Sequence, residues 1–393
     1  MTADLISGRL GGDVFPAQVL GREHRRYPAS EGQEDAFANL LTWPALNNLL
    51  ATQRLDAPRM RLSAGELIDT SAYTRLRRYR RMADWNAPIP HLFHQQLREG
   101  ATLVLDAIEE MHPPLRVVVT QLEAWLRTTI QVNAYASWTS RQGFGVHWDD
   151  HDVLILQVSG RKRWRIYGTT RLAPLHNDVE FSNEKPAEPI DEFVMEPGDI
   201  LHVPRGCWHA VAASEGEPSL HLTCGLVTTT GADFLRWLTQ QMVTHAAVRS
   251  DIPRRPEEYG PWTQSIAELI SMKLKSPDVV DEYWGHLDVT DEPRPVFSLP
   301  DAVTGDLADD TVVRPASLRG SVTMDGAVVT YSAQGRRWRF PAKVGPMISH
   351  LHQEGESSVK ELRELVPDAS SSAVVKLLRT LMDDGALVCE VST

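Results

Sequence analysis

The segment HWDDHD at residues 147–152 places five groups that can bind metal ions or transfer protons within six positions. Side chains alternate between the two faces of a β-strand, so in a strand that begins at about Gly145 the side chains of His147 and Asp149 share one face. An imidazole and a carboxylate that point to one place can fill two coordination positions of a metal ion. We therefore predict that His147 and Asp149 are metal ligands.

The other residues of this segment are not expected to bind the metal. His151 shares the face of the two ligands but lies one step further along the strand, where it would line the substrate side or pack structurally. Trp148, Asp150 and Asp152 fall on the opposite face. We expect Trp148 to cover the other side of the sheet, and the two aspartates to be turn and surface carboxylates.

A third ligand is expected from the segment MEPGDILHVPRGCWHAV (195–211), which contains His209. Two histidines and one carboxylate form the facial triad of non-haem Fe(II) oxygenases, which leaves coordination positions open for a cosubstrate and O₂. The His-x-Asp motif alone is a weak signal, but it is a strong one within a β-rich region that precedes a Pro-Gly-Asp turn and another histidine. The alternative is that His147 and Asp149 form a structural hydrogen-bonded pair, because most of the 14 histidines must be surface or core residues.

A lysine in the segment GRKRWRIYG (160–168) also points to a ligand. Strand alternation puts Lys162 on the same face as Trp164 and Ile166, which are expected to face inward, while three arginines occupy the other face. A buried ammonium group is costly unless it is paired, and this strand offers no acidic partner. An anion inside the barrel, such as a dicarboxylate cosubstrate, would pair with it. The alternative is a lysine that extends to the mouth of the barrel.

Two further segments present small or hydrogen-bonding groups on one face. Asn133 and Tyr135 point the same way in TIQVNAYAS, and His221, Thr223 and Gly225 share a face in SLHLTCGLV. We interpret these faces as walls of a polar cavity. The alternative is that they are the solvent faces of an exposed sheet.

The segment 128–228 must position these residues, and its short apolar runs separated by Gly and Pro predict an antiparallel sandwich or barrel. The turns at 159–160 and 196–199 are interpreted as hairpins, with Gly198 adopting the φ that a tight turn needs. Residues 1–125 are expected to be mixed and mostly helical. Their predicted helices cover residues 42–55, 92–111 and 113–126.

Residues 231–285 return to helical periodicity, and the segment 288–310, rich in Pro and Asp, is interpreted as a linker. A strand pair at 326–340, three helices and a final strand follow. This order is typical of a winged-helix-like module.

Composition limits the classes of partner and compartment. The net charge of −12 argues against a large nucleic-acid footprint, although a local basic patch is compatible with it. Three separated cysteines without Cys-x-x-Cys spacing suggest neither a disulfide framework nor a structural zinc site. The chain has no signal-peptide pattern at its start and no run of about 18 apolar residues. We therefore expect a soluble, cytoplasmic protein.

The segments GVHWDDHDVLILQVSGRKRWRIYG, MEPGDILHVPRGCWHAV and HLTCGL resemble the JmjC-type ribosomal oxygenases, a cupin-like group of Fe(II)- and 2-oxoglutarate-dependent protein hydroxylases. The resemblance is close over residues 128–228 and extends through the following helices, which build a dimerisation region in this family, to the C-terminal module. It implies an α+β fold with a double-stranded β-helix (jelly-roll, cupin/JmjC) core. The predicted domains are a mostly helical part at 1–125, the catalytic core at 126–228, a helical dimerisation region at 229–300 and a winged-helix-like domain at 301–393.

The resemblance also implies roles for single residues. His147, Asp149 and His209 would be the iron ligands. Lys162 would pair with the distal carboxylate of 2-oxoglutarate, and Thr223 would be another cosubstrate contact.

Asn133 and Tyr135 stand where relatives that hydroxylate histidine hold the substrate side chain. Gly225 stands where those relatives have a serine, which weakens the histidyl assignment. His202 replaces the more usual aromatic residue and is expected to face away from the iron.

The predicted activity is hydroxylation of an amino-acid side chain, commonly at Cβ and with histidine favoured, in a peptide or protein. Fe(II), 2-oxoglutarate and O₂ are the implied cofactor and cosubstrates. A ribosomal protein and the precursor peptide of a natural product remain as candidate substrates. The alternatives are N-methyl-lysine demethylation and a non-enzymatic cupin-like binding protein with a winged-helix reader. We expect a homodimer, as the resemblance implies, and no membrane contact. A nucleic-acid partner is not expected, because the helix at 371–384 ends in two aspartates and suits a DNA groove poorly.

Overall fold

The computed structural model describes residues 2–79, 82–140, 143–178, 182–213, 217–227, 229–291, 294–299, 303 and 307–390. The chain divides into two compact units, residues 1–228 and 229–393, which are described separately.

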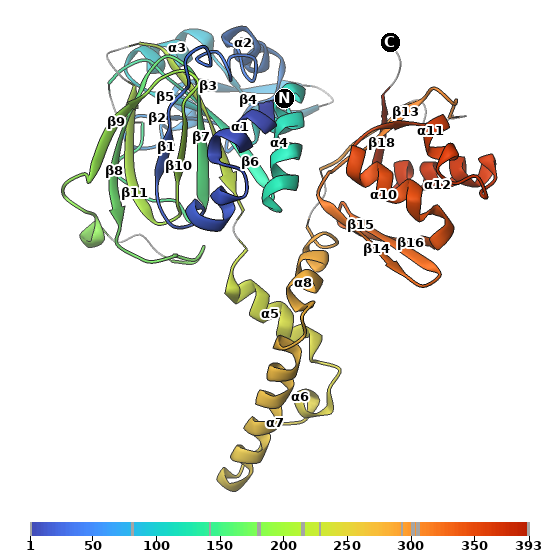
Figure 1. Ribbon diagram of the computed structural model, residues 1–393. Coiled ribbons are helices and arrows are strands. Elements are labelled where there is room, and N and C mark those ends of the chain that lie inside the picture. Colours follow the sequence, from blue (N-terminus) through green and yellow to red (C-terminus); the bar gives the residue numbers. More distant parts are fainter. Residues whose placement is uncertain are drawn as a thin grey trace. The chain divides into compact units, whose positions relative to one another are not determined.

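The first unit contains a seven-stranded and a three-stranded antiparallel sheet (Figure 1). The large sheet has the order β1 (Arg25–Tyr27), β10 (Ile200–Val203), β7 (Asp152–Ser159), β12 (Ser219–Leu226), β6 (Ile130–Ser137), β5 (Thr102–Leu105) and β2 (Met60–Ser63). The small sheet has the order β11 (Cys207–Ala213), β8 (Lys162–Thr169) and β9 (Asp191–Met195).

Two apolar clusters hold these sheets in a layered arrangement. One cluster joins Val153 and Ile155 of the large sheet to Trp164 and Ile166 of the small sheet, so it fills the space between them. The other lies on the opposite face of the large sheet and includes residues of two helices, α1 (Thr2–Leu10) and α4 (Pro113–Leu126). Figure 1 shows both helices against the barrel wall. This is the predicted jelly-roll core with flanking helices.

Strand alternation decides which side chains of β6 and β12 enter the space between the sheets. Even-numbered residues of both strands belong to the helix-side cluster. The odd-numbered residues therefore face the small sheet. Tyr135 lies opposite His221, and Asn133 lies opposite Thr223. The sequence prediction that these polar residues share an inner face is correct.

The N-terminal region is less helical than predicted. Helices α2 (Trp43–Thr52), α3 (Pro90–Arg98) and α4 form where the sequence predicts them. Residues 102–105, however, are strand β5 rather than part of a helix over 92–111. Their side chains are all buried, because β5 pairs with both β2 and β6. Residues of this region are thus part of the barrel wall. A separate hairpin is formed by β3 (Thr74–Tyr79) and β4 (Met82–Pro88).

The two predicted hairpin turns are tight turns, but they do not join paired strands. The turn at Gly160 leads from β7 in the large sheet to β8 in the small one, and the turn at Gly198 leads from β9 back to β10. Gly198 has φ +86°, and a Cβ there would lie 2.4 Å from the carbonyl oxygen of Gln33. The sequence indicated the turn, but pairing partners depend on distant strands.

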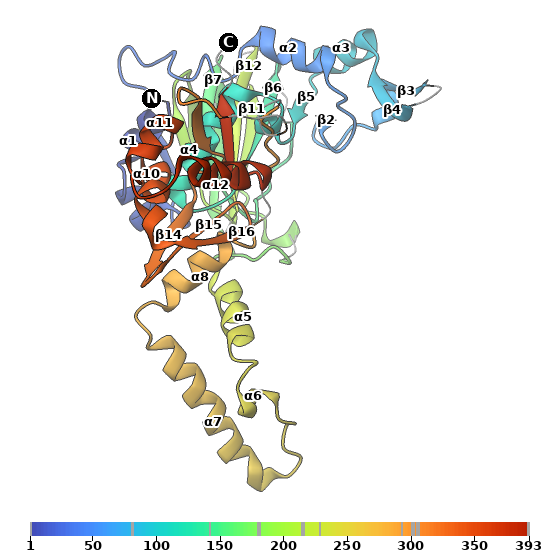
Figure 2. The same cartoon turned by 90° about the vertical axis from the view of Figure 1, so that its right-hand side faces the viewer.

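The second unit begins with a helical segment (Figure 2). Its helices are α5 (Gly231–Gln241), α6 (Ala246–Arg249), α7 (Pro256–Leu274) and α8 (Val279–Leu287). Trp237 and Leu238 of α5 pack with Val279 and Tyr283 of α8. Helix α7 has 19 residues, and none of them is buried.

The remainder of the second unit contains the predicted strand pair, three helices and final strand, together with the strands β13 (Val312–Pro315), β14 (Gly320–Asp325) and β17 (Ser357–Ser358), which were not predicted. A sheet of β14, β15 (Val328–Ala333) and β16 (Arg336–Pro341) precedes the helices α10 (Gly345–Glu354), α11 (Val359–Glu364) and α12 (Ser371–Asp383). A second sheet joins β17, β13 and β18 (Leu387–Glu390). Val374, Leu378 and Leu381 of α12 are buried in the core of this module, so its apolar face is used for packing. Among the described residues, no helix combines the length and apolarity that a membrane crossing needs.

Candidate metal centre

The segment that carries His147 and Asp149 is not the regular strand that the sequence suggested. Strand β7 begins only at Asp152, and His147 forms an isolated antiparallel bridge with His209. Each of these histidines donates its backbone N–H to the carbonyl of the other, at 3.1 and 2.8 Å, and Gly206 N–H donates to the carbonyl of Asp149. The backbone pairing with the entry to β11 therefore positions these residues, and alternation along β7 does not.

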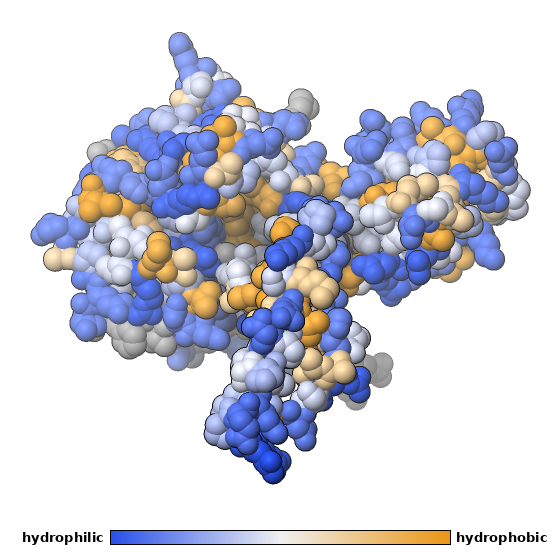
Figure 3. Space-filling view, turned by 60° about the horizontal axis from the view of Figure 1, so that its bottom comes forward, coloured by the Kyte–Doolittle hydropathy of each residue, from blue (hydrophilic) through white to orange (hydrophobic). Residues whose placement is uncertain are grey.

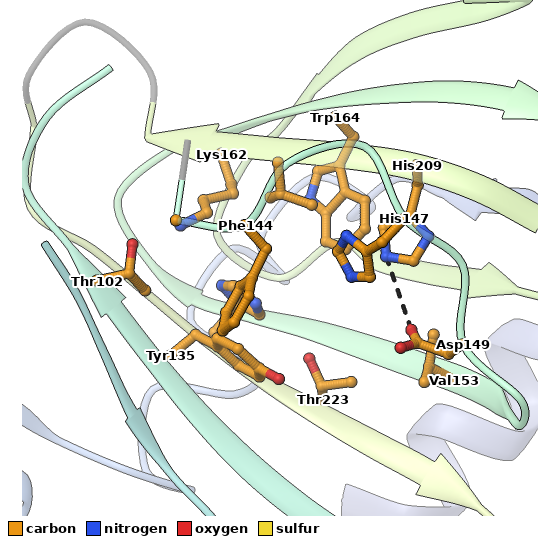
Figure 4. Close-up of a pocket in the computed structure, with 13 residues that line it drawn as sticks. Thr102, Tyr135, Phe144, His147, Asp149, Val153, Lys162, Trp164, His209 and Thr223 are labelled. Carbon is orange, nitrogen blue, oxygen red and sulfur yellow. Dashed lines mark ion pairs between the residues drawn. The ribbon is translucent and has the colours of Figure 1, made fainter. Parts of the chain in front are cut away.

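The side chains of His147, Asp149 and His209 converge. One ligand atom from each lies within 4.8 Å of the other two, and His209 Nε2 is 3.7 Å from Asp149 Oδ2 (Figure 4). His147 Nδ1 lies 2.8 Å from the carbonyl of Gly145, and His209 Nδ1 lies 3.0 Å from the carbonyl of Cys207. An Nδ1–H that donates to a carbonyl leaves Nε2 as the free lone pair. Both rings thus have the tautomer that suits metal binding.

The electrostatics of this group favour a cation. Burial lowers the pKa of His209 to about 4, with a further contribution from His147 and an opposing one from Asp149. A neutral imidazole is the form that binds metal ions. Two imidazoles and one carboxylate fit a divalent transition metal such as Fe(II), with positions left open.

Asp152, which follows His147 and Asp149 in the chain, is not in its predicted environment. Asp152 was expected at the surface, but it is 3% exposed and accepts hydrogen bonds from Gly21 N–H (2.6 Å), Arg205 N–H (3.1 Å) and His202 Nε2 (3.0 Å). Its pKa is lowered, because these bonds outweigh the effect of burial. Sequence alternation missed this because all three partners are distant in the chain. His202 is fully buried beside Asp152, in the outer-face environment predicted for it.

Asp150 and His151 form a different cluster, nearer the surface. His151 Nδ1 is 2.9 Å from Asp150 Oδ1, and His176 bonds the other oxygen of Asp150. The ring of His151 lies over Gly225, where a Cβ would be 2.9 Å from its Cδ2 and Nε2. His151 therefore takes the space that a side chain at position 225 would need.

Lys162 lies inside the barrel, as the sequence predicted. It is 3% exposed and shares its buried face with Trp164 and Ile166. Its ammonium group donates to Ser137 Oγ at 2.5 Å. Burial lowers the pKa of Lys162 to about 7. A hydroxyl does not neutralise an ammonium charge, so an anion in the pocket would be strongly favoured.

A single pocket runs from the three converging ligands to Lys162 (Figure 4). Of the predicted site residues, Tyr135 and Thr223 line it, whereas Asn133 does not. The Oδ1 of Asn133 accepts from Ala107 N–H and from Gln131 Nε2. The lining residues are Thr102, Tyr135, Gly143, Phe144, His147, Asp149, Val153, Lys162, Trp164, His209, Val211, His221 and Thr223.

Among the pocket residues to which sequence reasoning gave no specific role, three carry rings that pack in the site. Trp164 stacks on His209 at 5.7 Å between ring centroids. His221 stacks on Tyr135 at 4.9 Å, and Phe144 lies at the edge of Tyr135. Strand alternation predicted that His221 and Trp164 face inward. Phe144 precedes β7 in an irregular segment, where no alternation predicts the direction of its side chain.

Comparison with known proteins finds a domain match and several similar proteins. Residues 111–234 match the JmjC domain. A bifunctional lysine-specific demethylase and histidyl-hydroxylase NO66 from Drosophila persimilis is 28% identical over 187 residues, which are 48% of this chain and 26% of that protein. The NO66 of Drosophila grimshawi is 32% identical over 156 residues, which are 38% of this chain and 21% of that protein. The chain thus spans about a quarter of the length of these curated relatives.

The likeness to solved structures covers nearly the whole chain. The structure of ycfD from Escherichia coli has a TM-score of 0.62 and 17% identity, over 96% of this chain and 97% of that one. Further structures of that protein, described as a ribosomal oxygenase, contain cobalt with succinic acid or with 2-oxoglutarate, with TM-scores of 0.59. At this identity the likeness establishes the fold.

Proposed function

We propose, from the JmjC domain that residues 111–234 form, that this protein is an Fe(II)- and 2-oxoglutarate-dependent oxygenase that hydroxylates an amino-acid side chain in a peptide or protein. The observation that carries the proposal is the convergence of His147, Asp149 and His209 at one end of a pocket whose other end holds an unneutralised lysine. A metal centre and a buried cation in one cavity suit a chelating dicarboxylate.

The residues of the pocket have different proposed roles. His147, Asp149 and His209 would hold Fe(II), which supplies the oxygen-activating chemistry when bound. Lys162 would hold the distal carboxylate of 2-oxoglutarate, and Thr223, which lies between Tyr135 and Asp149 in Figure 4, would contact the cosubstrate nearer the metal. The apolar walls Val153, Trp164 and Phe144 would keep water from the reacting atoms. Positioning and exclusion of water are the protein's contribution.

We propose a peptide or protein substrate, with a histidyl side chain favoured, as in the name of the NO66 relatives. A ribosomal protein, as the name of ycfD suggests for that protein, and the precursor peptide of a natural product are the two candidate sources. Tyr135 is the proposed substrate contact, and Asn133, which does not line the pocket, is proposed to support it. Because Asn133 already accepts two hydrogen bonds, its role would be to fix the wall beside the substrate.

Demethylation of N-methyl-lysine is a second candidate, because the NO66 relatives are named for both activities. The two reactions have different products, since hydroxylation adds one oxygen to the peptide, whereas demethylation releases formaldehyde. Gly225, with the ring of His151 above it, stands where histidine-hydroxylating relatives have a serine. This difference weakens the histidyl assignment, so the products of both reactions must be measured.

We also propose that the protein is a cytoplasmic homodimer. Support for the dimer comes from the helical segment of the second unit, where α7 buries no residue and Leu235, Met272 and Leu274 are exposed. Figure 3 shows apolar side chains among polar ones on these helices. Support for the cytoplasm comes from the three cysteines, which are buried and form no disulfide in the part of the chain that the structure describes. The charge of −12 argues against a nucleic-acid partner.

The proposed activity is tested in two steps. Anaerobic addition of Fe(II) and then 2-oxoglutarate should produce a weak metal-to-ligand charge-transfer band, and its absence in folded protein would refute the oxygenase proposal. Peptides from ribosomal proteins and precursor peptides are then incubated with the aerobic enzyme. Mass spectrometry should find a gain of one oxygen and locate it, while a formaldehyde assay reports demethylation.

A further inference from the structure

We propose that His221 is a second binding residue for the distal carboxylate of 2-oxoglutarate and donates an imidazole N–H to it beside Lys162. The inference rests on the proposed function and adds a residue to the inner end of the same pocket. Three observations on the His221 ring carry it.

The first observation is an unsatisfied nitrogen. His221 is 3% exposed and lines the pocket, yet its Nδ1 is fully buried and has no hydrogen-bond partner among the described residues. An unpaired buried polar group costs about 1–3 kcal/mol. A leucine or phenylalanine would fill the same space without this cost, so packing alone does not account for an imidazole at this position.

The second observation is that the ring is held in one orientation. It stacks on Tyr135 with a centroid distance of 4.9 Å and an interplanar angle of 1°. Trp164 meets it edge-on, at 6.1 Å and 69°. On the backbone, His221 is paired with Tyr135 of β6 and Gln157 of β7, in the centre of the large sheet. A ring clamped in this way is preorganised and loses little entropy when it binds a ligand.

The third observation is the closeness of Lys162. Burial lowers the pKa of His221 well below its ordinary value, and the charge of Lys162 lowers it further. The ring is therefore neutral and carries one N–H. A buried donor without a partner costs more than a buried lone pair, so Nδ1 is best left without the proton. The proton then lies on Nε2, which becomes the donor to the ligand.

The hydrogen-bonding capacity of a carboxylate matches the donors at this end of the pocket. An ionised carboxylate has about four acceptor sites, and Lys162 with its Ser137 partner leaves part of them unfilled. Asp149 is the one carboxylate among the residues that line the pocket, and it belongs to the metal end. A neutral N–H from His221 adds a directed hydrogen bond without bringing a second positive charge beside the lysine.

The test uses full-length protein loaded with Co(II) and measures two dissociation constants, for Co(II) and for 2-oxoglutarate. His221→Phe keeps the stacked ring but removes the nitrogens. We expect its dissociation constant for 2-oxoglutarate to rise about tenfold, which corresponds to a net hydrogen bond of about 1.4 kcal/mol. The constant for Co(II) should change less than twofold. His221→Gln, which keeps an N–H donor, should recover part of the affinity.

A matched control is Cys224→Ala on the opposite face of the same strand, where the side chain is 1% exposed in the helix-side cluster. It should leave the 2-oxoglutarate constant within twofold. A double variant with Lys162→Met should show coupling, because both residues are proposed to bind one carboxylate. If His221→Phe binds 2-oxoglutarate as well as the wild type, or weakens Co(II) and 2-oxoglutarate in proportion, the inference is wrong.

A measurement on the wild type covers the case in which His221→Phe does not fold. Protein with ¹⁵N-labelled histidine and bound Zn(II) should gain one exchange-protected histidine N–H resonance when 2-oxoglutarate is added. No such resonance would overturn the role of His221 while leaving the proposed function intact. Failure of the wild type to bind 2-oxoglutarate at all would instead refute the proposed function, and the inference with it.

Discussion

The two ends of the pocket hold their chemical groups in different ways. At the metal end, each histidine ring is fixed by a bond from Nδ1 to a backbone carbonyl, and the backbones of His147 and His209 bond to each other. At the inner end, Lys162 has a hydroxyl as its hydrogen-bond partner, and His221 Nδ1 has no partner among the residues that the structure describes.

This difference indicates what each end requires. The metal end has its shape before any ligand arrives, because backbone hydrogen bonds set the orientation of its rings. The inner end has its shape too, but its charge is satisfied only by an anion. Changes at the metal end should therefore abolish all binding, and changes at the inner end should weaken one ligand alone.

The largest effect is expected for Asp149→Ala. It removes the carboxylate ligand, so the affinity for Co(II) or Fe(II) should fall by more than about 100-fold, beyond what second-shell changes cause. Succinate formation should fall to background. Asp150→Ala is the matched control, because its carboxylate bonds His151 and His176 instead, and it should keep metal affinity within about threefold. If Asp149→Ala retains iron and succinate production, the ligand assignment is wrong.

Lys162→Met tests whether the inner end can be changed without affecting metal binding. Methionine fills similar space without charge, so the dissociation constant for 2-oxoglutarate should rise about 10- to 100-fold, the value of a charge-assisted hydrogen bond. Metal content should stay intact. Arg163→Met, on the exposed face of the same strand and paired with Glu192, should change neither constant. Equal loss of metal and 2-oxoglutarate in Lys162→Met would contradict the separation of the two ends.

The inner end was the more predictable one. Lys162, Thr223 and His221 lie on regular strands, where period two fixes the face of each side chain. The sequence therefore placed the buried lysine correctly, including its lack of an acidic partner on its own strand. A resemblance to a family then suggested the ligand.

The metal end was predicted by motif and not by geometry. His147 and Asp149 lie before β7, and their position depends on a bridge to His209, about sixty residues away. Asp152 was assigned to the surface for the same reason, since its partners lie on β10 and in two loops. Strand β5 was taken for helix because the strands that pair with it, β2 and β6, are also distant in the chain.

Asp152→Asn tests whether these distant bonds support the metal end. Asparagine keeps one acceptor oxygen for Arg205 N–H but turns an amide NH₂ toward the other donors, so the loop before His209 should loosen. We expect Co(II) affinity to fall about tenfold, within the range of second-shell effects. The 2-oxoglutarate constant of fully metal-loaded protein should not change.

Asp199→Asn is the control for Asp152→Asn. Asp199 is also buried and accepts from backbone N–H groups, but it binds Arg26 and Ala29 rather than the ligand loops. It should lower the melting temperature without changing Co(II) affinity. If both variants weaken Co(II) equally, Asp152 contributes only to general stability.

The smallest effect is the pH dependence of 2-oxoglutarate binding. Burial lowers the pKa of Lys162 to about 7, so in the empty pocket the lysine loses its charge as the pH rises through that value. The dicarboxylate binds the protonated form, and its affinity should therefore be highest below pH 7 and fall about threefold between pH 6.5 and 7.5. His221 remains neutral throughout this interval, because its pKa lies well below it. Calorimetry in buffers of different ionisation enthalpy should detect proton uptake on binding above pH 7. Lys162→Met should bind 2-oxoglutarate weakly at every pH, with no proton uptake. A wild-type affinity that is constant between pH 6.5 and 7.5 would mean that Lys162 keeps its charge without the anion. The inner end would then not depend on a ligand for its charge balance, and the contrast with the metal end would fail.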